Sequence, residues 1–353
     1  MLLSKLRVSI FACEGYPVDL SLSGEQRQLV DSFAAMYTRE STSQRVRAAE
    51  PLGFDPKLWE ALVQTGVVEM AVGESDGGWG ASELELALIA EQYGRAVASA
   101  PVIEAQIAAR LLAACGDDDL LAATMSGDRL VSFAPRSCDG DVLGLVPGGA
   151  VADTVVALVG GRLVALSATD REHVENLGTL PLADVVTRGD VTVLAEGQHA
   201  RRLFTAAVDL WLTLTAAALV GAAAKAVEIG AEYAKQRYAF GAPIGTFQAV
   251  SHPLADSATA TDGARLLAFE AACAFSDEPD RVTELAAMAF AFAYETARDA
   301  TYRSLHIHGG YGFGMEGDIQ LYYRRVRGWA MVFGEPAVAL DRVADARYGP
   351  VAG

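Results

Sequence analysis

Residues 237–252 read RYAFGAPIGTFQAVSH and separate two long alanine-rich helical patterns, one at about 205–236 and one at about 246–275. Gly241, Pro243 and Gly245 prevent a continuous helix through this stretch. The pattern therefore predicts the turn of an αα-hairpin.

Two side chains of this stretch offer more than a turn. Arg237 is expected to end the first helix with a guanidinium group that can bind an anion through two hydrogen bonds. Gln248 is expected to present an amide about one turn into the second helix. The alternative is that Arg237 only complements the negative end of its helix.

The composition limits the classes of partner. A chain of 353 residues can bury a large core and form two or three domains. Its net charge of −17 argues against a nucleic acid or an acidic membrane surface as partner. No apolar run is long enough to predict a membrane span. An anionic ligand would need local arginines, and the candidates are Arg237 and the cluster Arg324, Arg325 and Arg327. A solvated helix face is the alternative for that cluster.

The cysteines and the N-terminus predict a cytoplasmic protein. Four cysteines (Cys13, Cys115, Cys138 and Cys273) show neither metal-ligand spacing nor clustering with histidines, which is typical of reduced thiols. No metal site is expected. Residues 1–20 are interpreted as an irregular leader, because their apolar core is too short for a signal peptide.

Hydrophobic periodicity predicts a mainly α-helical chain with a small β-domain. Residues 21–128 are predicted to form a helical domain, with N-caps at Ser23, Asp55 and Ser82 and a helix end at Gly94. Residues 129–200 are predicted to form a reduced middle β-domain, with strands at 131–133, 154–159, 162–166 and 190–194. Residues 201–353 are predicted to form an antiparallel four-helix bundle with a short last helix.

Three motifs carry a family resemblance. The stretch 237–248 matches RxxFGxPIGxFQ, residues 306–313 read HIHGGYGF, and residues 72–80 read VGESDGGWG. In this order they resemble the acyl-CoA dehydrogenase family over nearly the whole chain. The resemblance implies that family's fold, FAD as cofactor and an acyl-CoA thioester as substrate.

The resemblance also implies which residues contact the ADP half of FAD. His306 replaces the family's usual Gln but can still donate one hydrogen bond. His252 is either a further contact or a polar core residue. The predicted cofactor-binding residues are Arg237, Phe240, Gly241, Gln248, His306, Gly309 and Gly310.

The middle domain departs from the family. Acyl-CoA dehydrogenases usually carry T-E-P-x-x-G-S-D and W-I-T-N runs that hold the flavin ring, and neither is found here. Residues 133–137, which read FAPRS, stand where the first run is expected. The β-domain is therefore expected to lack the flavin-ring site.

The catalytic base is also missing from the positions that the resemblance indicates. The family places its Glu at one of two positions, which align here with Phe333 and Trp211. Glu335 and Asp209 lie two residues away from them. Two residues along a helix rotate a side chain by about 200°, so Asp209 should face elsewhere. Glu335 is a weak candidate, since it precedes Pro336 and is expected to start the last helix.

The family shares each FAD between two subunits, and actinobacterial members include α2β2 heterotetramers for steroid side-chain breakdown. This chain resembles their short, non-catalytic subunit, with a longer catalytic chain as partner. One alternative is a self-sufficient homotetramer that uses Glu335. Another is a flavin-free scaffold or acyl-CoA-binding relative.

Overall fold

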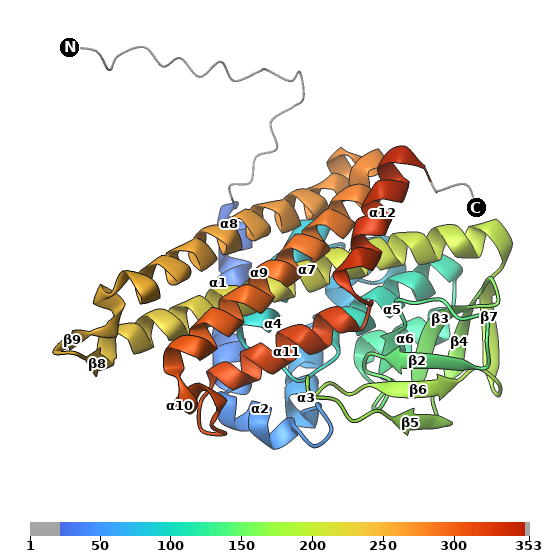
Figure 1. The fold of residues 1–353 in the computed structure, drawn as a ribbon. Helices are drawn as coiled ribbons and strands as arrows, with labels where there is room; N and C mark the ends of the chain where they lie inside the picture. Colours follow the sequence, from blue (N-terminus) through green and yellow to red (C-terminus); the bar gives the residue numbers. More distant parts are fainter. Residues whose placement is uncertain (1–21, 350–353) are drawn as a thin grey trace, which may run out of the picture.

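The structure is a computed structural model that describes residues 22–349 (Figure 1). The predicted leader at 1–20 lies outside these residues. The N-terminal part is helical, and Ser23 and Ser82 form the predicted capping boxes while Asp55 caps its helix. The helices are α1 (Gly24–Glu40), α2 (Ser43–Ala49), α3 (Pro56–Gln64), α4 (Glu83–Arg95), α5 (Val102–Cys115) and α6 (Asp118–Ser126).

Two small sheets form the middle domain. The first has the order β1-β3-β4-β7 and the second the order β2-β6-β5. Gly160 and Gly161 turn β3 into β4 with φ of 54° and 74°, the left-handed geometry of a tight hairpin. The strands are β1 (Val131–Phe133), β2 (Val142–Val146), β3 (Thr154–Val159), β4 (Arg162–Ser167), β5 (Arg171–His173), β6 (Ala183–Val186) and β7 (Val191–Ala195).

The second sheet was not predicted. Strand β5 is exposed along its whole length, and the pairing of β2 with β6 is interrupted by a register shift. Neither β5 nor β2 therefore shows the strict alternation of buried and exposed residues by which strands are recognised in a sequence.

The C-terminal part is a helical bundle (Figure 1). Two-residue strands β8 (Tyr238–Ala239) and β9 (Ala242–Pro243) form the tip of the predicted hairpin. Gln248 is the first residue of its helix, so its expected place one turn inside is wrong. The helices are α7 (Gly197–Gln236), α8 (Gln248–Asp277), α9 (Val282–His308), α10 (Gly310–Phe313), α11 (Ile319–Met331) and α12 (Pro336–Tyr348).

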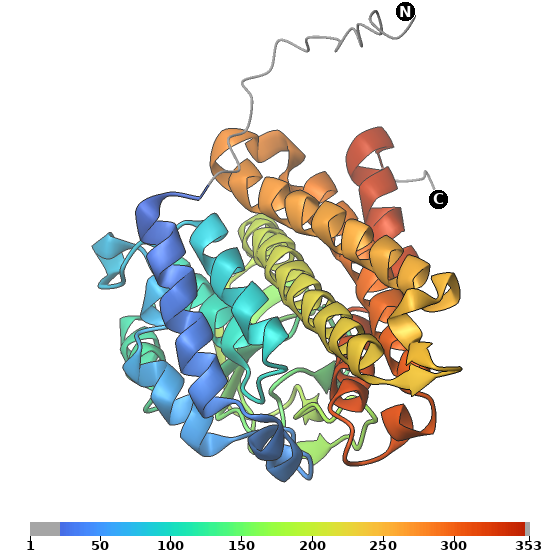
Figure 2. The same ribbon diagram turned by 90° about the vertical axis from the view of Figure 1, so that its left-hand side faces the viewer.

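Helix α7 is the central element. It begins at Gly197, eight residues earlier than the expected start near 205, because its first turns are polar and lack a side-chain cap that would mark the start. It contacts α4, α5, α8 and α9, and Figure 2 shows it between the N-terminal helices and the rest of the bundle. In the described part of the chain α7 is the one helix long and apolar enough to cross a membrane. Its most apolar window is 83% buried inside the protein, so packing within the core accounts for its composition.

Helices α4 and α7 touch through their backbones. A Cβ atom on Gly94 would lie 1.8 Å from the carbonyl oxygen of Ala218, and one on Gly221 would lie 2.0 Å from that of Glu91. Both distances are far inside van der Waals contact, so only glycine fits. Gly94 therefore does not end its helix, as the sequence suggested; α4 continues through it to Arg95.

We expect Gly221→Ala to lower the free energy of unfolding by about 2–3 kcal/mol, because the added methyl group pushes α7 away from α4. Gly263→Ala is the matched control inside α8. Its Cβ would lie 3.6 Å from Phe292, an ordinary contact, so this variant should gain about 0.5–1 kcal/mol. Urea unfolding measures both. Equal stability of the two variants would contradict the backbone contact.

Candidate functional site

The hairpin tip presents four of the predicted cofactor-binding residues. Arg237 caps the C-terminus of α7, where its backbone N–H donates to the carbonyl of Tyr233 at 2.9 Å. Its side chain is exposed and makes no ion pair within residues 22–349. Phe240 is 99% exposed, and it and Gly241 have φ of 52° and 81°. Gln248 is exposed at the start of α8.

The other three lie where α9 ends. His306 is exposed and stacks on Tyr302, with ring centroids 6.1 Å apart. Gly309 has φ 59° and ψ −141°, a conformation that essentially only glycine adopts. A Cβ atom on Gly309 or Gly310 would meet nothing within 4 Å. The turn is therefore open to the approach of a ligand along its backbone.

These residues fit the ADP half of FAD. An unpaired guanidinium suits the pyrophosphate, and glycine turns with free space beside them suit close backbone approach. Large aromatic side chains remain exposed around them, namely Tyr238, Phe247, Tyr311 and Phe313. Both segments belong to the same end of the bundle, at the left of Figure 1, where the β8–β9 tip and α10 lie.

Two arginines of the α11 cluster, Arg324 and Arg325, are structural, so for them both interpretations, an anion site and a solvated face, are wrong. Arg324 pairs with Glu50 of the N-terminal part. Arg325 is 2% exposed and donates to the carbonyls of Val97 and Ala98 and to the hydroxyls of Ser99 and Thr179. Burial lowers its pKa below the usual arginine value. Arg327 stacks on the ring of Tyr323 at 3.6 Å.

The two positions aligned with the family's base come together in space. The rings of Trp211 and Phe333 lie 6.1 Å apart, and both contact Phe290, at 6.0 and 5.8 Å. All three side chains are buried. Aromatic packing therefore fills the volume that a catalytic carboxylate would occupy at either of the two aligned positions.

The neighbouring acids point elsewhere. Asp209 accepts from the Thr283 hydroxyl at 2.7 Å and from Arg342 Nη2 at 2.5 Å, so it faces α9 and α12, as expected from its helical position. Glu335 is exposed immediately before α12. An exposed carboxyl lacks the apolar, water-poor pocket in which a general base for this reaction is expected to lie.

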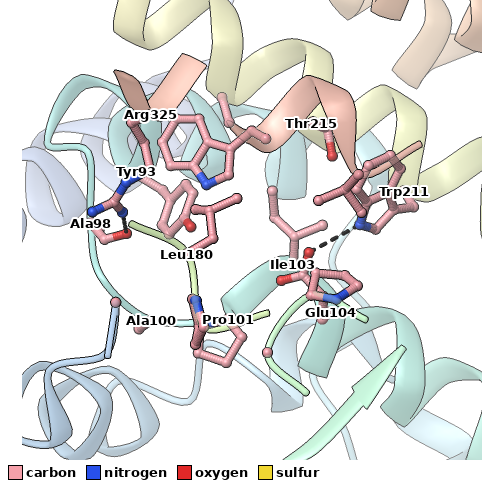
Figure 3. A pocket seen from close by; sticks show the side chains of 17 residues that line it. Tyr93, Ala98, Ala100, Pro101, Ile103, Glu104, Leu180, Trp211, Thr215 and Arg325 are labelled. Carbon is pink, nitrogen blue, oxygen red and sulfur yellow. Dashed lines mark hydrogen bonds between the residues drawn. The ribbon is translucent and has the colours of Figure 1, made fainter. Parts of the chain in front are cut away.

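A partly buried acid that the sequence analysis did not single out stands beside the aromatic residues. Glu104, in the first turn of α5, accepts a hydrogen bond from Trp211 Nε1 at 3.0 Å (Figure 3). Burial raises its pKa above the usual glutamate value. No sequence signal marks Glu104 as desolvated, because an acid in a first helical turn is ordinarily a solvated partner of the helix dipole.

Glu104 lines a small internal cavity. Tyr93, Thr215 and Arg325 also line it, and Figure 3 shows Glu104 and Trp211 on one side and Tyr93 and Arg325 on the other. Its volume of about 30 Å³ admits one or two waters at most. An acyl thioester has no room there.

We expect Glu104→Gln to flatten part of the pH dependence of stability. The folded pKa is raised, so the stability that Glu104 contributes is complete below its unfolded pKa and is lost as pH rises through the folded pKa. Gln keeps an acceptor for Trp211 but cannot ionise. The variant should therefore gain stability over the parent at pH 8.5 relative to pH 5.5, at about 1.4 kcal/mol per unit of pKa shift. Urea unfolding at both values measures this. A pH slope in Glu104→Gln equal to that of the parent would contradict a raised pKa for Glu104.

Comparison with known proteins places the chain in a family. Residues 23–126 match the model of the acyl-CoA dehydrogenase N-terminal domain and residues 212–347 that of the C-terminal domain. Acyl-CoA dehydrogenase IpdE2 of Mycolicibacterium smegmatis is 30% identical over 328 residues, which cover 91% of this chain and 98% of that protein. IpdE2 of Mycobacterium tuberculosis is 28% identical, covering 90% and 96%.

Solved structures agree. The steroid ACAD Tcur3481–Tcur3483 superposes with a TM-score of 0.82 at 28% identity, covering 92% of this chain and 97% of that one. Butyryl-CoA dehydrogenase from Megasphaera elsdenii, at 21% identity and a TM-score of 0.80, shows the same fold, with coverage of 93% and 99%. The predicted three-part architecture is therefore confirmed. The chain belongs to the acyl-CoA dehydrogenase family, whose members are FAD-dependent.

Proposed function

We propose that this chain is the short, non-catalytic subunit of a heteromeric, cytoplasmic FAD-dependent acyl-CoA dehydrogenase. It supplies the ADP-side contacts to an FAD whose ring lies in a longer partner subunit, and that partner carries the catalytic Glu. The observation that carries the proposal is the contrast between the two sites of this chain. The ADP-side residues are exposed and open, whereas both base positions are filled by the packed rings of Trp211 and Phe333.

The geometry of α7 supports sharing of the cofactor. Trp211 and Arg237 are roughly 26 residues apart on one helix, about 39 Å at 1.5 Å per residue. That span exceeds the length of an extended FAD. A flavin whose pyrophosphate binds Arg237 therefore has its ring outside the base region of this same chain, on a neighbouring subunit.

Exposed aromatic residues support a partner surface at the same end. Phe240 and Phe247 contact each other at the hairpin tip, with ring centroids 6.2 Å apart, and Phe240 is almost fully exposed. Tyr311 and Phe313 follow the Gly309–Gly310 turn and are also exposed. Large exposed apolar groups that gather around a charged contact mark a protein interface.

In the proposed enzyme, this chain's residues bind the cofactor and exclude water, and the partner performs the proton transfer. FAD bound there would supply the hydride acceptor for oxidation of the acyl-CoA at its β-carbon. Arg237 would hold the pyrophosphate through charge-assisted hydrogen bonds, and the turn at Gly309 and Gly310 would admit the adenosine half. The rings of Trp211, Phe290 and Phe333 exclude substrate and water from this chain's own base region. Abstraction of the α-proton is assigned to the partner's Glu.

The substrate class follows from a relative. The solved structure at 28% identity is described as a steroid ACAD and its name joins two components. We therefore propose CoA thioesters of steroid-derived acids as the substrate class to assay first. We also propose that the two subunits assemble as an α2β2 tetramer.

We expect an α2β2 tetramer of this chain and its catalytic partner to contain two FAD. This β-domain lacks the flavin-ring runs, so the composite site formed from it and the partner's bundle stays empty. Co-expression followed by flavin absorbance per mass of complex measures the ratio. Four FAD per tetramer, or a stable flavin-loaded tetramer of this chain alone, would favour the self-sufficient enzyme. No flavin in either preparation would favour the flavin-free scaffold.

We expect Glu335→Gln to leave turnover of the assembled enzyme within a few-fold, because its carboxyl is exposed to solvent. Removal of a general base costs roughly 10²–10⁴-fold. The matched control is the carboxylate-to-amide change at the partner's Glu, which should show that loss. A loss of that size in Glu335→Gln with flavin still bound would restore Glu335 as the base.

A further inference from the structure

The two predicted cofactor segments lie on different helices, and one aromatic pair joins them. Tyr233, in the last turn of α7, stacks on His308, the last residue of α9. Their ring centroids are 4.1 Å apart and their planes differ by 24°. His308 is buried and Tyr233 is partly buried. Neither residue has a role in the function proposed above.

On the α7 side, Tyr233 is linked directly to Arg237. The Tyr233 carbonyl accepts the backbone N–H of Arg237 at 2.9 Å, which is the bond that closes α7. A shift of the Tyr233 ring moves this last turn and, with it, the origin of the Arg237 side chain.

On the α9 side, His308 directly precedes the glycine turn. Its Nδ1 lies 2.7 Å from the carbonyl oxygen of Ser304, so Nδ1 carries the proton and donates to it. This bond and the Tyr233 stack fix the imidazole ring on two sides. Gly309 leaves α9 from this fixed residue with φ 59°.

The far side of the turn folds back onto the same residue. A Cβ atom on Gly312 would lie 2.6 Å from the Leu305 carbonyl oxygen and 3.0 Å from His308 Cβ. His308 therefore anchors both the entry to the Gly309–Gly310 turn and the short helix after it. Without this anchor, ordering Gly309 and Gly310 when a ligand binds would cost more conformational entropy.

We propose that the Tyr233–His308 stack is a positioning device for FAD: it sets Arg237 and the Gly309–Gly310 turn at the spacing that one ADP moiety requires. The inference rests on the proposed function, because it assumes that both segments contact the same FAD. The stack contributes by pre-organising the site, so that less conformational freedom is lost when the cofactor binds.

The test uses the flavin-containing assembly, stripped of FAD and titrated with FAD by fluorescence. Tyr233→Leu removes the stack and should raise the dissociation constant about three- to ten-fold, the usual size of an aromatic-pair contribution. Tyr233→Phe keeps the stack and should stay within about two-fold. Phe204→Leu is the matched control on the other end of α7, where Phe204 packs on Phe133 with centroids 5.7 Å apart. It should lower the melting temperature and leave the affinity for FAD unchanged.

A double-mutant cycle separates positioning from general loosening. Arg237→Ala should raise the dissociation constant about ten-fold or more, the usual size of a lost charge-assisted hydrogen bond. Adding Tyr233→Leu to it should then cost less than the same change in the parent, because the stack no longer has an arginine to position. Full additivity, or equal effects of Tyr233→Leu and Phe204→Leu on affinity, would overturn the inference while the proposed function stands. No loss of affinity in Arg237→Ala would overturn the FAD role of this end, and the inference with it.

Discussion

The backbone contact between α4 and α7 is the constraint on which the rest of the structure depends. Gly94 and Gly221 let the two helices approach until carbonyl oxygens occupy the places of missing side chains. That contact fixes the middle of a 40-residue helix against the N-terminal domain. Both Trp211, in the first half of α7, and Arg237, at its C-terminal end, are then placed relative to a rigid rod. A shift at the crossing would be transmitted to both ends.

The region aligned with the family's base is packed in a way that stabilises the fold. A catalytic carboxylate must be held in apolar surroundings at a cost in stability. Here Trp211, Phe290 and Phe333 fill that volume with buried rings, which stabilises the fold instead. Glu104 remains as a desolvated acid, but Trp211 satisfies one of its oxygens. In the proposed enzyme, the partner subunit bears the cost in stability of the buried base.

Features set by neighbouring residues could be predicted from the sequence, and features set by distant packing could not. Ser23, Asp55 and Ser82 cap their helices within four residues of chain, so their pattern was sufficient. Gly94 was misread as a helix end because the reason for it lies on α7, more than a hundred residues away. The role of Arg325 depends on carbonyls of the N-terminal part, and that of Glu104 on Trp211. Neither contact leaves a local signal.

In the proposed heteromeric enzyme, the separation of the two sites along α7 couples FAD binding to subunit association. A chain that holds only the ADP-side contacts gains little from FAD by itself, since a few charge-assisted bonds must offset the ordering of a long, flexible cofactor. When a partner supplies the ring site, the same contacts act on a cofactor that is already placed. FAD then stabilises the complex over the separate chains by mass action. In the proposed enzyme, cofactor loading and subunit association therefore reinforce each other.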